Sequence, residues 1–120
     1  MESILDSIKK LLGISKEDTH FDMDIIMHIN SAFADLNQIG VGPSETFVIE
    51  DDGPIWSDFT EEDNSLNNVR TYVYLSVKLI FDPPTSSFVL SAMERKLKEA
   101  EWRLNVSASN KPTEENDNDE

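Results

Sequence analysis

Two histidines and two aspartates near residue 20 come closest to a metal-binding pattern in this chain. They are His20, Asp22, Asp24 and His28, and Asp24 and His28 are four positions apart, which places them one turn apart on a helix. A metal site needs further ligands, and no third ligand motif accompanies this pair. Acidic residues at the start of a helix also stabilise its dipole without any metal. We therefore predict that the chain binds no metal ion.

Other arrangements of catalytic side chains are also missing from the sequence. The chain has no cysteine, so thiolate nucleophiles and disulfides are excluded. It has no Gly-x-Ser-x-Gly motif, and its four glycines form no phosphate-binding loop. The acid-rich segment 50–63 lacks the alternating oxygens of an EF-hand loop, and paired catalytic carboxylates would need a sheltered cleft. We predict that the chain is not an enzyme and carries no cofactor.

The charges are numerous and unevenly distributed. The formal net charge is −14 at pH 7. From Glu17 to Val69 there are thirteen Asp or Glu residues and no Lys or Arg, whereas from Arg70 to Arg103 six basic residues stand against four acidic ones. Phosphate groups would be repelled by such a chain, so specific DNA binding is disfavoured. The pattern predicts an acidic front half, a faintly basic back half, and partners that are other proteins.

Large apolar side chains between acids are the first candidates for a protein contact. The segment 47–59 is too short to bury its five large apolar residues by itself. Either it folds back on the helices, with Trp56 and Phe59 filling the core, or it meets a partner. Trp102 presents the same choice, as an anchor or as a surface ring. The predicted interface residues are Phe47, Ile49, Asp51, Asp52, Ile55, Trp56, Phe59, Arg95, Lys98, Trp102 and Arg103.

Two helices are expected in the first third of the chain. Apolar residues recur at helical spacing over residues 2–12, and Gly13 is suited to end that helix. A second helix is expected from the acids at Asp22 and Asp24 to Ile39, before Gly40. In residues 47–56, Asp52-Gly53 lies between apolar β-formers, which predicts a β-hairpin, and residues from Ser57 onward can form one helical turn.

Two longer helices are expected in the rest of the chain. Residues 65–82 carry two apolar stripes, so that helix should be buried on most sides until Pro83 and Pro84 end it. Thr85, Ser86 or Ser87 can then cap a last amphipathic helix. Its expected apolar face comprises Phe88, Val89, Ala92, Met93, Leu97, Ala100 and Leu104.

The predicted organisation is a mainly α protein with one domain and a tail. Residues 1–106 form a small four-helix domain with a β-hairpin-like insertion between the second and third helices, and residues 107–120 form a disordered acidic tail with one apolar residue. The N-terminus carries acids where a signal peptide is basic, and no apolar run is long enough to span a membrane. We expect a protein made in the cytoplasm, without a membrane anchor.

Four stretches of this chain form a recognisable pattern: residues 25–30 (IIMHIN), 36–43 (LNQIGVGP), 72–84 (YVYLSVKLIFDPP) and 101–105 (EWRLN). Through them the chain resembles, over residues 4–105, the small helical head–tail connector proteins of tailed bacteriophages, also called adaptor or head-completion proteins. The resemblance implies a virion neck component, assembled in the host cytoplasm. Its subunits would form a ring beneath the portal protein, extend the DNA channel and present a surface to the next neck or tail protein. It implies no catalytic residues.

The charge distribution agrees with a ring. A ring uses contacts between two different patches on neighbouring copies, and an acidic half and a basic half suit that arrangement. We expect the hairpin of one subunit to lie against the last two helices of its neighbour, and DNA to pass through without specific binding. Two alternatives are an acidic inhibitor that mimics DNA, and a regulatory module that grips one protein through Trp56 and Phe59.

Overall fold

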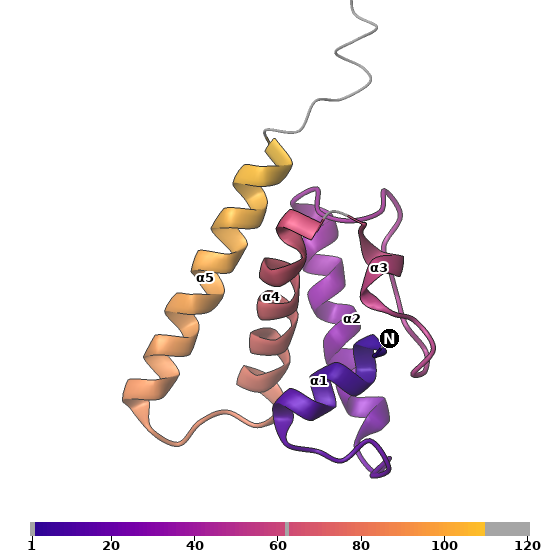
Figure 1. Cartoon of the computed structure of the whole chain (residues 1–120). Coiled ribbons are helices and arrows are strands. Elements are labelled where there is room, and N and C mark those ends of the chain that lie inside the picture. Colours follow the sequence, from indigo (N-terminus) through magenta and orange to yellow (C-terminus); the bar gives the residue numbers. More distant parts are fainter. Residues whose placement is uncertain (1, 62, 110–120) are drawn as a thin grey trace, which may run out of the picture.

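The protein is a bundle of helices in which α4 lies between α2 and α5 (Figure 1). The computed structural model describes residues 2–61 and 63–109. Within these residues the helices are α1 (Ile4–Leu12), α2 (Asp22–Gln38), α3 (Trp56–Phe59), α4 (Asp63–Phe81) and α5 (Ser87–Ser109). Helix α1 packs on both α2 and α4. None of the helices in these ranges is long and apolar enough to cross a membrane.

The ends of α1 show why the sequence predicted this helix correctly. The Ser3 hydroxyl accepts a hydrogen bond from the Asp6 N–H at 3.0 Å, which caps the first turn. Gly13 adopts a φ of 83° after the last turn, a conformation that is cheap only for glycine. The helix buries Ile4, Leu5 and Ile8. Both boundaries are thus set by local side chains and confirm the prediction.

Helix α4 is the central element of the core, as the two apolar stripes predicted. Val69, Val73 and Val77 are fully buried, while Tyr72 and Leu75 are nearly so. The stripe does not stay covered to its end, because Ile80 in the last turn is 64% exposed.

Helix α5 is amphipathic, but only its C-terminal half is buried. Ser86 caps the helix, since its hydroxyl accepts from the Val89 N–H at 3.3 Å. Ala100 and Leu104 are buried, whereas Phe88, at the other end of the predicted apolar face, is 70% exposed. In Figure 1 the start of α5 lies away from α4, after the connection that contains Pro83 and Pro84. The predicted apolar face therefore contacts the core over part of its length.

The end of α5 overlaps the predicted tail. The helix continues to Ser109, so residues 107–109, assigned to the tail from the sequence, are helical. The remainder of the predicted acidic tail, residues 110–120, lies outside the described residues.

The predicted β-hairpin is wrong. No strand occurs in the described ranges, and residues 46–54 form an irregular loop whose nearest approach to β-structure is an isolated bridge between Ser3 and Ile55. The Ile4 N–H donates to the Pro54 carbonyl at 2.9 Å, so the second arm of the expected hairpin pairs with the start of α1. Pro54 itself has no N–H to donate to a ladder. The expected helical turn is present as α3, beginning at Trp56.

Candidate protein-interaction surfaces

The loop between α2 and α3 is held by a side chain of α2. The Ile49 N–H donates to Asn30 Oδ1 at 2.8 Å, and Asn30 Nδ2 donates to the Ile49 carbonyl at 3.0 Å. Closer to the helix end, Asn37 Nδ2 donates to the carbonyls of Pro43 and Ser44 at 3.1 and 3.3 Å. The Asn30 bonds satisfy backbone groups of Ile49 that the expected hairpin would have paired within itself, and the Asn37 bonds hold the start of the loop.

The apolar residues of the loop fold back on the helices. Phe59 stacks on Phe33 of α2 with ring centroids 4.7 Å apart, and Phe47 meets both rings edge to face. Trp56 donates from Nε1 to the Ser7 hydroxyl of α1 at 2.9 Å. Trp56 is 4% and Phe59 3% exposed, and Ile49 is also buried. Of the two alternatives for these side chains, the structure shows the core, so Ile49, Trp56 and Phe59 are not available to a partner.

The same loop leaves its acids outside. Asp51 and Asp52 are exposed as predicted, and Phe47 and Ile55 are half-buried beneath them. Asp51 Oδ1 accepts from the Gly53 N–H at 2.9 Å, and Asp58 Oδ2 accepts from the Ile55 N–H at 2.9 Å, so two carboxylates shape the loop. We use the term acidic surface for the exposed residues Glu50, Asp51, Asp52, Asp58 and Glu61.

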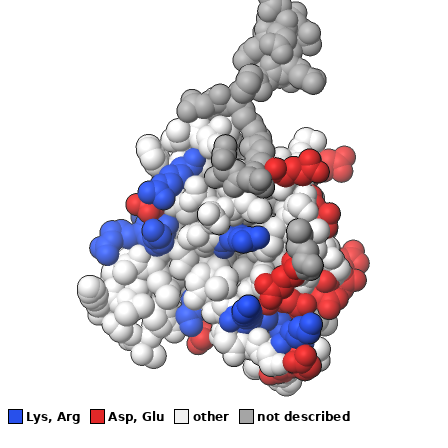
Figure 2. Space-filling view, in the orientation of Figure 1, with Lys and Arg blue, Asp and Glu red and all other residues white. Residues whose placement is uncertain are grey.

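The outward face of α5 carries the predicted basic residues. Arg95, Lys98, Trp102 and Arg103 are all exposed and recur at spacings of three, four and one residues, which places them on one side of the helix; we call them the basic surface. Trp102 is 64% exposed, so it is a surface ring. Arg103 lies 3.7 Å from Glu99, a weak exposed ion pair. Figure 2 shows basic side chains along α5 and acidic ones on the opposite side, over the α2–α4 connection.

Lys9 was not expected to matter, yet it is fully buried. Its Nζ donates to the carbonyls of Lys16 and Asp18 at 3.2 and 2.7 Å and lies 2.8 Å from Asp22 Oδ1. The ammonium group thus donates two hydrogen bonds to backbone carbonyls and forms an ion pair with the Asp22 carboxylate. The available signal was its position, since Lys9 falls within the apolar stripe of α1. Lys9 fixes the α1–α2 connection against the start of α2.

The histidines and aspartates that we considered as metal ligands are not brought together. Asp22 pairs with Lys9, and His20 packs edge to face on Phe21 with ring centroids 4.6 Å apart. Across residues 2–61 and 63–109, no group of three or more His, Asp or Glu side chains is placed to share an ion.

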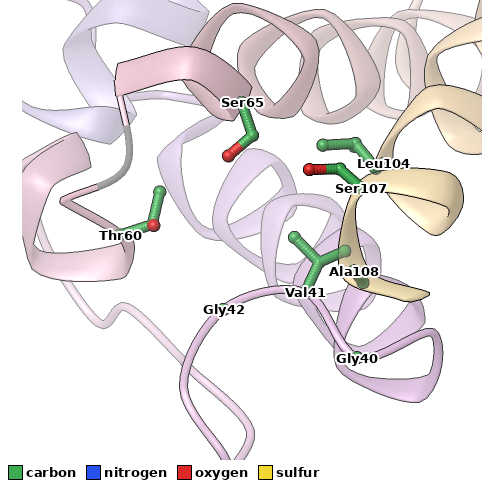
Figure 3. Close-up of a pocket in the computed structure, with 8 residues that line it drawn as sticks. All are labelled: Gly40, Val41, Gly42, Thr60, Ser65, Leu104, Ser107 and Ala108. Carbon is green, nitrogen blue, oxygen red and sulfur yellow. The ribbon is translucent and has the colours of Figure 1, made fainter. Parts of the chain in front are cut away.

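A small cleft marks where the last turns of α5 meet the other helices (Figure 3). Leu104, Ser107 and Ala108 come from α5, and the residues facing them come from the loop after α2, from the α3–α4 connection and from the first turn of α4. These facing residues are Gly40, Val41, Gly42, Thr60 and Ser65. The cleft holds about 10 Å³, room for about one water molecule. It is a packing junction and is too small for a ligand.

A comparison with known protein families identifies the family of this chain. Residues 4–111 match the family described as Phage connector protein, so the match includes all five helices. No curated protein and no solved structure matches the chain. The match confirms the resemblance drawn from the sequence, and it implies a virion component that contacts other phage head and tail proteins. The chain, with its exposed acidic loop and basic last helix, belongs to the phage connector family and is a head–tail connector protein.

Proposed function

We propose that this connector subunit assembles into a ring beneath the portal protein, extends the DNA channel and docks the next neck or tail protein. The observation that carries the proposal is the separation of the acidic surface on the α2–α3 loop from the basic surface on α5 (Figure 2). Two different, complementary patches on one subunit favour a contact between unlike surfaces of neighbouring copies. Repeated around an axis, such contacts close into a ring.

Trp102 is the residue best suited to anchor this contact. It lies between Lys98 and Arg103 on the exposed side of α5, and a tryptophan that becomes buried at the centre of an interface contributes strongly to affinity. The charges around it would orient the neighbour, because rim charges mainly set specificity and the rate of encounter. The predicted interface thus retains Asp51, Asp52, Arg95, Lys98, Trp102 and Arg103 as its exposed members.

An apolar end of the subunit supports a second contact, to the portal or to the next neck or tail protein. Ile80 at the end of α4 and Phe88 and Val89 at the start of α5 are exposed large apolar side chains. Phe21 is also exposed and packs on Phe81 with ring centroids 5.3 Å apart. Exposed large apolar side chains in neighbouring segments are typical of surfaces that a partner covers. We assign this end to a partner other than a second copy of the chain, since it carries neither charged surface.

The proposal gives DNA and catalysis no specific role. A net charge of −14 allows a duplex to pass without being held, because each exposed cation on a channel wall would add a phosphate contact. We likewise propose that the subunit acts by binding alone and carries no cofactor. Its proposed place is the virion neck, after assembly in the host cytoplasm.

Two variants, each with one charged surface reversed, test the proposed ring directly. In one variant Asp51→Lys and Asp52→Lys reverse the acidic surface, and in the other Lys98→Glu and Arg103→Glu reverse the basic surface. Each alone should weaken self-association or portal-bound assembly at least about tenfold, measured by sedimentation and electron microscopy. Mixed together, the two variants should assemble again as alternating subunits, because each reversed surface now faces a complementary one. Glu17→Lys, an exposed reversal outside both surfaces, is the control.

Three results would contradict the proposal. The first is assembly of either variant alone at the wild-type level, and the second is failure of the mixture to assemble. The third is absence of any symmetric complex of the wild-type chain with its cognate portal at micromolar concentration and moderate salt. A complex with a nuclease or polymerase that DNA displaces would instead favour the acidic-inhibitor alternative.

A further inference from the structure

A shallow groove runs between α1, α4 and α5. It consists of two adjoining hollows of about 330 and about 290 Å³, which share Leu11 of α1 and Arg70 of α4. Tyr74 and Leu75 of α4 form the floor of the first hollow, and Lys96 of α5 forms its wall. Leu11 is 55% exposed, although Ile4, Leu5 and Ile8 of the same helix are buried. The groove is thus an apolar strip that the described residues leave uncovered.

The rim of the groove is basic. Arg70 borders both hollows, Lys96 borders the first and Lys10 the second. The Arg70 guanidinium lies 5.7 Å from the centroid of the Trp56 ring, which orients it. Among the side chains that the structure describes, no carboxylate forms an ion pair with Arg70 or Lys10, and Lys96 has only an exposed pair with Glu99 at 3.3 Å. Glu2, at the far end of the second hollow, is the one acid in the lining of the two hollows.

The C-terminal segment of the chain has the opposite charge. Residues 110–120 contain five acids and one lysine. They follow α5, whose axial rise from Lys96 to Ser109 is about 20 Å at 1.5 Å per residue. Eleven residues in extended form span about 36 Å, which is enough to return along α5 to Arg70 and Lys96. The length of segment 110–120, the position of its first residue after α5 and its negative charge therefore all fit the groove.

We infer that the acidic segment 110–120 docks in the groove between α1, α4 and α5 of its own chain. Its carboxylates pair with Arg70, Lys96 and Lys10, and its backbone covers Leu11. Because the segment is tethered to α5, its effective concentration at the groove reaches the millimolar range, so weak contacts are sufficient. Exposed ion pairs are screened by salt, so the docked state depends on ionic strength. The inference concerns the single subunit and does not depend on ring assembly.

A spin label on the segment tests the inference in the full-length chain. The protein has no cysteine, so Asn118→Cys provides a single labelling site. Paramagnetic broadening in nitrogen-15 spectra at low salt should be strongest at the amides of Leu11, Arg70 and Lys96, and should disappear at about 0.5 M salt. A labelled variant with all five acids neutralised (E114Q, E115Q, D117N, D119N and E120Q) should lose the broadening without any change to the helical domain.

A pair of lysine variants on α5 distinguishes docking in the groove from a general attraction of the acidic segment to positive charge. Lys96→Gln should reduce the broadening at Leu11 at least about twofold, whereas Lys98→Gln, on the outward face of α5, should leave it unchanged. Broadening confined to the end of α5, or spread evenly over the surface, would overturn the inference. Mixing spin-labelled chains of natural isotope content with unlabelled nitrogen-15 chains separates intramolecular from intermolecular docking. If the groove amides broaden in that mixture as much as in the labelled nitrogen-15 chain, the segment docks on a neighbouring copy. That result would also overturn the inference.

Discussion

The side-chain amide of Asn30 forms hydrogen bonds with both the N–H and the carbonyl of Ile49. Asn30 Oδ1 accepts from the Ile49 N–H at 2.8 Å, and Asn30 Nδ2 donates to the Ile49 carbonyl at 3.0 Å. A single side chain thereby does for one loop residue what a neighbouring strand does for a strand residue. The Ile49 side chain is buried in the hydrophobic core. The exposed acids at Asp51 and Asp52 depend on this anchor for their position.

Removing the anchor should destabilise the fold. Asn30→Ala leaves the N–H and carbonyl of Ile49 without partners in a part-buried place, so we expect a loss of about 2 to 3 kcal/mol in urea unfolding. Asn67→Ala, an exposed asparagine of α4, serves as the control and should change the stability by about 0.5 kcal/mol or less. Equal stability of Asn30→Ala and wild type would show that water replaces the amide.

Gly42 is expected to be much less tolerant of a side chain than Gly13. Both have positive φ, 90° and 83°, but a Cβ at Gly42 would overlap the Phe59 ring, whereas a Cβ at Gly13 meets nothing within 4 Å. Gly13→Ala should cost about 1 kcal/mol for its backbone conformation. Gly42→Ala adds overpacking and should cost about 3 kcal/mol in the free energy of unfolding. Similar costs for the two variants would mean that Phe59 moves aside freely.

Lys9 and Lys10 provide a comparison of a buried and an exposed lysine at adjacent positions. Lys9→Met deprives two carbonyl groups of their donor and the Asp22 carboxylate of its cationic partner, and it should cost about 3 kcal/mol. Lys10→Met should stay within about 0.5 kcal/mol of wild type. Asp22→Asn should have less effect in the Lys9→Met background than in wild type, which thermal or urea unfolding of the four chains would show.

Tyr72 should make the stability of the fold sensitive to alkaline pH. Burial, with the nearby carboxylates of Asp35 and Glu101, raises the pKa of the Tyr72 phenol from 10.0 to about 12. The raised pKa adds stability that is fully present below about pH 10 and is lost as the pH rises toward about 12. Unfolding midpoints of wild type and Tyr72→Phe should therefore converge over this window. Parallel curves for wild type and Tyr72→Phe would refute the assignment.

The two tryptophans should separate stability from assembly. Trp56→Ala empties a core position and should cost about 3 to 5 kcal/mol. Trp102→Ala should leave the unfolding free energy within about 0.5 kcal/mol of wild type, because its ring is on the surface, yet it should reduce self-association or portal-bound assembly. Normal assembly of Trp102→Ala would remove this residue from the proposed interface.

Helix positions could be predicted from the sequence because their ends are local. Gly13 and Ser86 act on residues within one turn of themselves, so spacing and residue type were sufficient. Periodicity predicted which residues of α5 share one apolar face, but it does not show how far a neighbouring helix covers that face. Phe88 is exposed for that reason, since α4 covers only the later turns.

The loop could not be predicted because its partners are distant in sequence. Asp52-Gly53 between apolar residues is a local hairpin pattern, but Asn30 and the start of α1 supply the hydrogen bonds instead. The same holds for Lys9, whose acceptors lie on the connection after its own helix. For the candidate surfaces, sequence reasoning found the exposed charges and Trp102, and it left open whether Trp56 and Phe59 are core residues, which the packing against Phe33 decides.

The attachment of α1 also constrains how the chain folds as it is made. The Ile4 N–H is bonded to the Pro54 carbonyl, and Trp56 reaches Ser7 over a separation of 49 positions. At 5 to 20 residues per second, a ribosome adds that stretch in roughly 2.5 to 10 s. During this interval α1 can pack on α2 but lacks its contacts with Pro54, Trp56 and α4. Helix α1 is therefore synthesised before the segments that complete its burial, and its docking is completed late.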